Sequence, residues 1–253
     1  MSTLQTIPEG WTAAPELLLG RAILVTGAAN GIGRALATAF AAHGAATILL
    51  DKDVRGLEQA YDEITAAGHP EPALYPLDLK GALPDDYADL AANLEKEYQG
   101  LDGLVHNAAQ LGALVPLANF DNEMWFETLQ VNLNAPYLLT LACLGLMKKC
   151  ADASIIFSTD ASGRQGKAYW GAYGVSKAGL EGFMQTLADE LETNYPVRVN
   201  SIDPGPVRTA LRSIAYPGED AAMLNAPEDI VNPFLYLLGP DSKGITGQQF
   251  KIT

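Results

Sequence analysis

The sequence has few cysteines and no pattern of histidines that suggests a metal site. Among its 253 residues only Cys143 and Cys150 are cysteines, seven positions apart in a stretch of helical character. Seven residues of helix span about 10 Å, which is too far for a disulfide. We therefore expect two reduced thiols, as in cytosolic proteins. The histidines His43, His69 and His106 are scattered, so no zinc-ligand spacing exists and no metal is expected.

Basic side chains are also scarce. The 16 Lys and Arg residues face 30 Asp and Glu residues, for a formal net charge of -14. Binding to nucleic acids or to anionic membranes depends on surplus Lys and Arg, so the composition argues against both partners. No apolar stretch approaches the roughly 20 residues of a membrane helix, and residues 1–20 lack the basic start and apolar core of a signal peptide. We expect a cytoplasmic protein that acts on a small molecule.

After an arm of residues 1–20 without clear periodicity, short apolar runs alternate with helical patterns as far as residue 253. Residues 21–253 contain no linker or repeat and are expected to form one domain. Short buried strands that alternate with helices predict an α/β fold with a doubly wound parallel sheet of about seven strands and helices on both faces. The expected strands are 22–25, 46–50, 73–77, 101–106, 154–158, 197–202 and 248–252, and the expected helices are 32–43, 54–67, 85–98, 124–150, 172–194 and 230–238.

A glycine-rich turn follows directly on the first expected strand. Glycines permit a tight turn and a close approach of the backbone to a pyrophosphate. The helix that starts near Gly31 would offer free N–H groups and its positive dipole end to the phosphates. The turn therefore predicts dinucleotide binding by a Rossmann-type domain, although a plain glycine-rich turn is an alternative. The expected cofactor residues here are Gly27, Asn30, Gly31, Ile32 and Gly33.

Two acidic residues follow later strands. Asp51 ends the second expected strand, where a carboxylate can accept hydrogen bonds from the ribose hydroxyls and would repel a 2′-phosphate. This favours NAD over NADP, although the neighbouring Lys52 and the earlier Arg34 are candidate phosphate partners. A solvated turn residue is the alternative for Asp51. Asp78, after the third strand, is placed to accept a hydrogen bond from the adenine amino group.

Tyr173 and Lys177 are the strongest catalytic candidates. Their spacing of four places both on one side of an expected helix. A tyrosine has an unperturbed pKa near 10, and a neighbouring ammonium together with a charged nicotinamide would lower it. Tyr173 could then exchange a proton with a substrate oxygen as hydride moves. The pattern alone is weak, and it gains force from following the glycine turn in sequence.

Taken in order, these motifs resemble the short-chain dehydrogenase/reductase family. The resemblance spans about residues 20–250, and the segments from Gly163 to Tyr173 and from Arg208 to Ala210 are also similar to the YciK-type bacterial oxidoreductases. It implies an NAD(P)(H)-dependent oxidoreductase that interconverts an alcohol and a carbonyl by hydride transfer. The motifs are Thr26-Gly27-x-x-x-Gly31-x-Gly33, Asn107-Ala108, Val131-Asn132, Tyr173-x-x-x-Lys177 and Pro204-Gly205-x-x-x-Thr209.

The resemblance also implies roles for single residues. Asn107 would shape the cofactor side of the fourth strand. Asn132 would hold a water that relays protons toward Lys177, unless it only marks a helix kink beside Pro136. Lys177 would bind the nicotinamide ribose and lower the pKa of Tyr173. The loop that holds Pro204, Gly205, Val207 and Thr209 would cover the nicotinamide carboxamide.

One position departs clearly from the family pattern. The family has a serine thirteen residues before its tyrosine, and here that residue is Asp160. An ionised carboxylate only accepts hydrogen bonds, so it cannot donate to a carbonyl or an alkoxide. Three interpretations remain: a hydroxyl of Ser158, Thr159 or Ser162 replaces the serine; Asp160 is protonated or binds a donor group of an unusual substrate; or the protein binds cofactor with weak or no turnover.

The substrate is not predictable from the sequence, but the segments around its pocket are. The loop from Arg208 to Asn225 should line it and carries Arg208, Arg212, Tyr216 and Met223, while Tyr169 and Trp170 could form an aromatic wall. For each arginine, a solvated loop charge is as good an interpretation as an anion partner. The expected helices 124–150 and 172–194 are apolar on more than one face, which with the resemblance predicts a homodimer or homotetramer.

Overall fold

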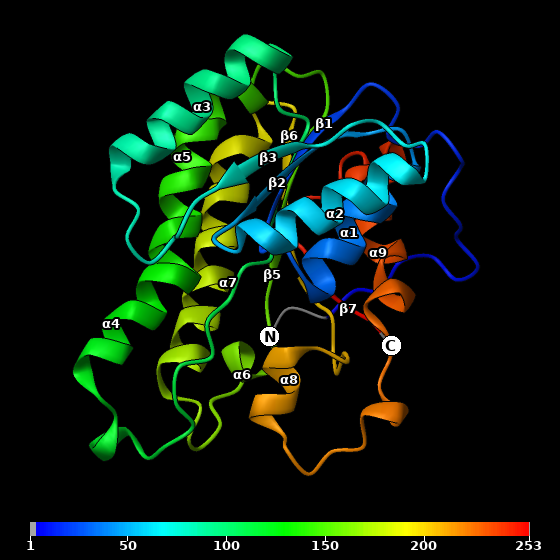
Figure 1. The fold of residues 1–253 in the computed structure, drawn as a ribbon. Coiled ribbons are helices and arrows are strands. Elements are labelled where there is room, and N and C mark those ends of the chain that lie inside the picture. Colours follow the sequence, from blue (N-terminus) through cyan, green and yellow to red (C-terminus); the bar gives the residue numbers. More distant parts are fainter. Residues whose placement is uncertain (1–3, 253) are drawn as a thin grey trace.

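The computed structural model describes residues 4–252 and contains a seven-stranded parallel sheet (Figure 1). The strand order is β3-β2-β1-β4-β5-β6-β7. The expected Rossmann-type, doubly wound fold is confirmed. The strands are β1 (Ala22–Thr26), β2 (Ala46–Asp51), β3 (Ala73–Pro76), β4 (Gly103–His106), β5 (Ala153–Ser158), β6 (Val197–Asp203) and β7 (Gln249–Lys251).

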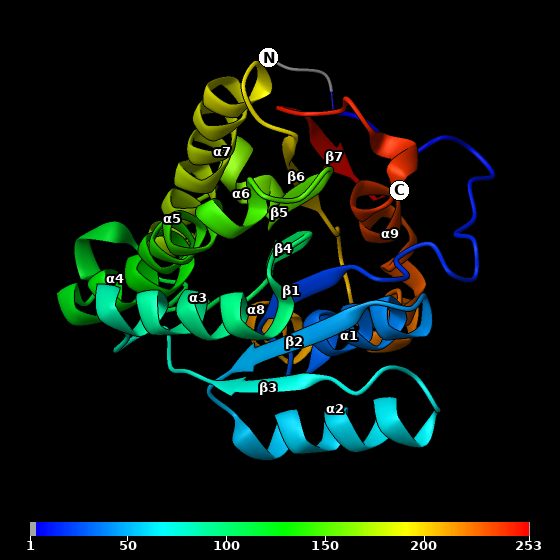
Figure 2. The ribbon, with the colours of Figure 1, turned by 90° about the horizontal axis from the view of Figure 1, so that it is seen from above.

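Helices cover both faces of the sheet, as the view from above shows (Figure 2). One layer contains α1 (Gly31–Ala42), α2 (Val54–Ala66) and α9 (Asn232–Leu238), and the other contains α3 (Pro84–Tyr98), α5 (Ala135–Met147) and α7 (Gly171–Glu192). Each layer packs its own apolar cluster against the sheet. The four central strands are buried along their whole length, which explains why the sequence shows them as continuous apolar runs.

The strand order reverses between β1 and β4. The chain leaves β1 toward β2 and β3 on one side, then returns and adds β4 to β7 on the other side. The loops at the carboxyl ends of β1 and β4 therefore run in opposite directions and leave a crevice between them. Ligands of open α/β sheets bind at this switch point.

The helix expected over 124–150 is present but carries a π-helical turn. It consists of α4 (Asn122–Leu129), the turn Gln130–Asn134 and α5, with Pro136 in the first turn of α5. Contrary to the sequence expectation, the continuous helix Asn122–Met147 is long and apolar enough to cross a membrane. Core helices meet the same criterion, and here 39% of the apolar window is buried inside the structure. This helix alone therefore does not indicate a membrane protein.

The N-terminal arm packs against the last strand and α9. Gln5 pairs with Phe250 in parallel fashion, and its N–H donates to the Gln249 carbonyl at 2.8 Å. The Trp11 ring meets Tyr236 edge to face at 5.3 Å, and its N–H donates to Asp241 at 2.8 Å. The arm thus covers the free edge of β7.

Two short helices border the pocket and were not expected from the sequence. They are α6 (Ala161–Arg164) and α8 (Ala210–Ala215). Each begins at a polar side chain that accepts a backbone N–H: Asp160 from Ser162, and Thr209 from Arg212. Such caps satisfy N–H groups that a helix start leaves free. The segment 204–227, expected as a loop, therefore contains α8.

Candidate active site

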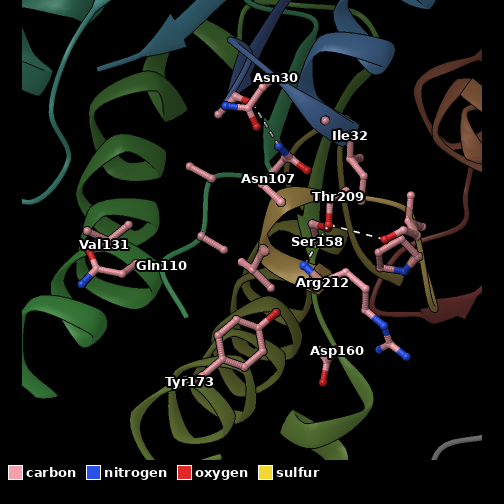
Figure 3. Close-up of a pocket in the computed structure, with 18 of the residues that line it drawn as sticks. Asn30, Ile32, Asn107, Gln110, Val131, Ser158, Asp160, Tyr173, Thr209 and Arg212 are labelled. Atoms are coloured by element: carbon pink, nitrogen blue, oxygen red, sulfur yellow. Dashed lines mark hydrogen bonds between the residues drawn. The ribbon is translucent and has the colours of Figure 1, made fainter. Parts of the chain in front are cut away.

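A pocket of about 480 Å³ lies at the carboxyl ends of the central strands, on the switch point of the sheet (Figure 3). It is formed by the glycine turn, the ends of β2, β4 and β5, the start of α7 and the loop after β6. Of the expected site residues it brings together Gly27, Asn30, Gly31, Ile32, Asp51, Asp78, Asn107, Asp160, Tyr173, Lys177, Pro204, Gly205, Val207 and Thr209. Gly33 and Asn132 lie behind its wall.

The glycine turn has the shape of a phosphate cradle. Gly27 and Gly31 have φ angles of 69° and 53°, in the left-handed region that favours glycine. A Cβ on Gly33 would lie 2.0 Å from the Gly27 carbonyl oxygen, so the turn can close this tightly only with glycine there. No acidic residue occupies the first turn of α1. Its free N–H groups therefore fit the pyrophosphate of a dinucleotide.

Asn107 fastens this turn to β4. Its N–H donates to the Thr26 hydroxyl at 3.0 Å, and its amide donates to the Thr26 carbonyl at 3.1 Å. The Ala108 N–H shares the same hydroxyl at 3.1 Å. These bonds hold the ends of two neighbouring strands at the floor of the pocket, which is the placement expected for Asn107.

The two acidic cofactor candidates line the pocket where β2 and β3 end. Asp51 accepts the N–H of Ala29 at 3.1 Å and that of Asp53 at 3.0 Å, one on each carboxylate oxygen. Asp51 is therefore held in place by the glycine turn itself. Asp78 is exposed and accepts the N–H of Lys80 at 3.1 Å. Arg34 points elsewhere, because it pairs with Glu63 on α2.

Tyr173 and Lys177 project from the first turns of α7. Lys177 is buried, donates to the Ser158 carbonyl at 2.7 Å, and has its Nζ 5.5 Å from the centre of the Tyr173 ring. Burial lowers the pKa of Lys177 to about 8, against the opposing effect of Asp160 and two further carboxylates. Burial raises the pKa of Tyr173 above its ordinary value, and Asp160 and Asp203 raise it further. The protein's own groups thus act opposite to the lowering expected from the sequence and keep the phenol protonated.

Two of these carboxylates, Asp203 and Glu181, belong to a charged cluster behind the pocket that the sequence did not reveal. Arg164 of α6 pairs with Asp203 of β6, and its other nitrogen lies 3.7 Å from Glu181 of α7. Glu181 also accepts the Ser201 hydroxyl at 2.6 Å. The members are scattered between positions 164 and 203, so only the fold places them together.

Asn132 is fully buried on the π-helical turn and has a positioning contact with the pocket wall. Its amide donates to the Gln110 carbonyl at 2.9 Å and to the Ser176 hydroxyl at 3.1 Å, and its oxygen accepts the Gln110 N–H at 2.7 Å. Gln110 lines the pocket and was missed in the sequence, where nothing distinguishes it from other loop glutamines. The water relay expected for Asn132 stays a prediction.

Asp160 faces the pocket at the position of the family serine. Of the three hydroxyls that could replace that serine, Ser158 and Thr159 belong to residues that line the pocket, and Ser162 does not. The hydroxyls of Thr159 and Ser162 are buried and have no hydrogen-bond partner among residues 4–252. Ser158 and Thr159 therefore both remain candidates for the hydroxyl that replaces the serine.

One side of the pocket has an aromatic wall, as expected in part. Trp170 and Tyr216 line it, with ring centroids 5.7 Å apart, and Arg212 stacks on Tyr216 at 3.7 Å. The other candidates from the sequence lie outside this pocket. Tyr169 and Met223 are exposed, at 58% and 83%, and Arg208 is exposed too.

Comparison with known proteins agrees with this geometry. A sequence model of the family described as short chain dehydrogenase matches residues 21–219. The oxidoreductase YciK of Escherichia coli K12 is 42% identical over 93% of this chain and 92% of its own length. A short chain dehydrogenase structure from Pseudomonas syringae superposes with a TM-score of 0.94 at 51% identity, covering 95% of this chain and 98% of the other.

The chain belongs to the short-chain dehydrogenase family. Within it, the chain is similar to YciK-type oxidoreductases, as the sequence indicated. A further short chain dehydrogenase structure, from Escherichia coli CFT073, was determined in complex with NADPH. It is 42% identical to this chain and superposes with a TM-score of 0.91. The match covers 94% of this chain and 98% of the other. Membership makes this protein an oxidoreductase of the NAD(P)-dependent kind.

Proposed function

We propose that this short-chain dehydrogenase interconverts an alcohol and a carbonyl, with Tyr173 as the proton donor or acceptor. The observation that carries the proposal is the position of Tyr173 and Lys177 in the same pocket as the glycine cradle. A bound nicotinamide supplies or accepts the hydride. The phenol of Tyr173 donates its proton to the developing alkoxide during reduction. Lys177, held by the Ser158 carbonyl, binds the ribose and eases this proton transfer.

The preferred cofactor in this proposal is NAD. Asp51 stands where the ribose hydroxyls would lie, and its carboxylate is fixed by two backbone N–H groups. A negative charge there repels a 2′-phosphate. Lys52 also lines the pocket and, among the described lining residues near Asp51, is the cation that could offset the repulsion. The relative from Escherichia coli CFT073 binds NADPH on a similar fold. The fold therefore does not decide between the two cofactors, and the proposed preference for NAD rests on Asp51.

A second candidate function is cofactor binding with weak carbonyl turnover. It is favoured by Asp160, which accepts the Ser162 N–H at 2.7 Å and has no hydrogen to donate when ionised. Losing one donor to the substrate oxygen commonly costs a factor of about a hundred to a thousand in rate. The hydroxyls of Ser158 and Thr159, both on residues that line the pocket, are the candidates that would restore this donor.

We further propose a cytoplasmic homodimer or homotetramer built through α4, α5 and α7. These helices expose large apolar side chains, with Phe126 at 68% exposure and Tyr137, Leu141 and Val175 each near half exposed. Sedimentation analysis at micromolar concentration tests this assembly. A monomer would contradict it.

The cofactor proposal is tested by titrating the protein with NADH and with NADPH and following nucleotide fluorescence. We expect tighter binding of NADH by the wild type. Asp51→Asn keeps an acceptor for one backbone N–H but removes the charge, so NADPH binding should tighten by about tenfold while NADH binding weakens by a similar factor or less. If the wild type bound NADH and NADPH equally well and Asp51→Asn changed neither affinity, the role assigned to Asp51 would be contradicted. If the wild type bound neither nucleotide, the proposed function would be overturned.

A further inference from the structure

The carboxylate of Asp160 has one oxygen that is free to meet a substrate. Its Oδ1 accepts the Ser162 N–H and so starts α6. Within residues 4–252 no group donates a hydrogen bond to Oδ2. The side chain lines the pocket, and in the view of Figure 3 it lies between Tyr173 and Arg212. An acceptor therefore stands where the reacting substrate atom must bind.

The cations near Asp160 are already occupied. Arg164 pairs with Asp203 and Glu181. Arg212 forms two hydrogen bonds with Glu219, both 2.6 Å long, and covers the Tyr216 ring. In the described part of the chain, no basic side chain lies within ion-pair distance of Asp160. Lys177 and Arg212 feel the charge of Asp160 only at longer range, and Lys177 donates to the Ser158 carbonyl instead. A partly buried carboxylate without an ion-pair partner favours a ligand that brings a positive charge or an N–H group.

The aromatic wall beside Asp160 also suits a flat cation. Trp170 meets Tyr173 edge to face at 5.5 Å and forms the side of the pocket with Tyr216. The Lys167 ammonium lies 5.3 Å and 5.1 Å from the Trp170 and Tyr216 ring centres, and the Arg212 guanidinium lies 3.7 Å from the Tyr216 ring centre, so these rings attract cations. Aromatic faces bind ring cations by the same attraction.

We propose that this site also reduces carbon–nitrogen double bonds, taking protonated cyclic imines whose iminium N–H donates to Asp160 Oδ2. The inference rests on the cofactor site and the hydride transfer of the proposed function, and it adds a second class of acceptor. It also gives Asp160 a role that a serine could not fill, because a hydroxyl carries no charge to balance an iminium.

The step balances without a proton from the protein. The iminium carbon accepts a hydride from the reduced nicotinamide, which becomes oxidised. The π electron pair of the C=N bond moves to nitrogen, the positive charge disappears, and a neutral secondary amine that keeps its N–H is formed. Carbonyl reduction differs, because the developing alkoxide must take a proton from Tyr173. A Tyr173 phenol whose pKa is raised by burial and by carboxylates suits a reaction that never needs its phenolate.

The test compares 3,4-dihydroisoquinoline with 1-tetralone, a neutral ketone of the same ring size, with NADH or NADPH as the reductant. We expect the wild type to have the higher kcat/KM for the imine. Asp160→Asn keeps an oxygen for the Ser162 N–H, removes the charge and puts an amide donor in place of Oδ2. It should lower imine turnover by about tenfold or more, while ketone turnover should rise, because the substrate oxygen gains a hydrogen-bond donor. Asp160→Ser should lower imine turnover and raise ketone turnover by about tenfold or more.

Two further readouts separate substrate recognition from damage to the fold. Tyr173→Phe should abolish most ketone reduction and retain most imine reduction, since only the ketone needs the phenol proton. Calorimetric titration with 1,2,3,4-tetrahydroisoquinoline, a cation at neutral pH, requires no hydride transfer. Its affinity for the wild type should exceed its affinity for Asp160→Asn by about tenfold.

The inference is overturned if the wild type reduces the ketone and not the imine, if Asp160→Asn affects both substrates equally, or if the amine binds wild type and variant alike. Each of these results leaves the proposed oxidoreductase function standing, provided that the reduced cofactor still binds and the ketone is reduced. Failure of NADH and NADPH to bind the wild type would instead remove both proposals.

Discussion

His106 is a titratable residue that the fold buries completely outside the reaction site. It ends β4, its Nε2 lies 2.8 Å from the Thr140 hydroxyl, and its ring stacks on Phe157 at 4.9 Å. Its Nδ1 has no partner among residues 4–252. Burial lowers the pKa of His106 from 6.5 to about 3, because the charged form loses its hydration. The residue is thus a neutral core side chain, as its place in a buried strand requires.

This burial makes the protein sensitive to acid. Between pH 6.5 and 3, His106 is protonated in the unfolded chain and neutral in the folded protein. Lowering the pH through this range therefore stabilises the unfolded chain and lowers the free energy of unfolding, whereas above pH 6.5 His106 causes no such loss. Between pH 7 and pH 5 the loss is about 2 kcal/mol. His106→Gln lacks the proton site, and urea unfolding at both pH values should show a smaller pH dependence by this amount. Equal pH dependence in wild type and variant would contradict the account.

The single residues that could be predicted from the sequence are those that belong to motifs with fixed spacing. Asp51, Asp160, Tyr173 and Lys177 stand at set distances from glycines or from one another, so they could be named before the structure. Gln110 could not, because its place in the pocket depends on hydrogen bonds to Asn132, 22 positions away. The effect of burial on Tyr173, which raises its pKa in the protein without cofactor, has the same origin, since burial is a property of the folded molecule.

Among the elements, the turn between β1 and α1 depends most strictly on residue type. Gly33→Ala would place a Cβ 2.0 Å from the Gly27 oxygen and 2.7 Å from the Asn107 amide, both parts of the cradle. We expect this variant to lose at least tenfold in NADH affinity and to unfold at lower urea concentration.

A matched control exists in α7. A Cβ added to Gly182 would meet no atom within 4 Å, and this helical residue is exposed. Gly182→Ala should therefore stabilise the protein by about 1 kcal/mol and leave cofactor affinity unchanged. If Gly33→Ala bound NADH as well as Gly182→Ala does, the glycine turn would not be the phosphate cradle.

The long elements were predictable because their apolar residues repeat with a clear period. The expected strands and helices match the observed ones within a few residues. The short helices α6 and α8, four and six residues long, offer no such period. They form because a capping side chain and the packing around it hold a single turn, and neither is visible in a local sequence window.

At the scale of the whole molecule, the N-terminal arm joins the two ends of the chain. Its contacts with β7 and α9 join residues more than 200 positions apart in the sequence, and Trp11 contributes a hydrogen bond to Asp241 and a ring contact with Tyr236. Trp11→Ala should lower the free energy of unfolding by about 2 kcal/mol, through lost apolar burial and the lost ring contact. Trp11→Phe keeps a ring there and should cost about half as much.

Urea unfolding followed by circular dichroism measures both variants. Activity should be unchanged, since the arm contributes no residue to the pocket. Wild-type stability in Trp11→Ala would show that the arm does not stabilise the sheet edge.

The central claim concerns the pocket as a whole: the glycine cradle, Tyr173 and Lys177 together transfer a hydride and a proton to a substrate carbonyl. The most direct measurement uses NADH with deuterium in both C4 positions and follows deuterium into the alcohol product by mass spectrometry, with wild type and Tyr173→Phe. The account predicts one deuterium in the wild-type product, and a rate about a hundredfold or more lower in Tyr173→Phe with cofactor affinity nearly unchanged. A wild-type product without deuterium, or an equal rate in the two proteins, would contradict it.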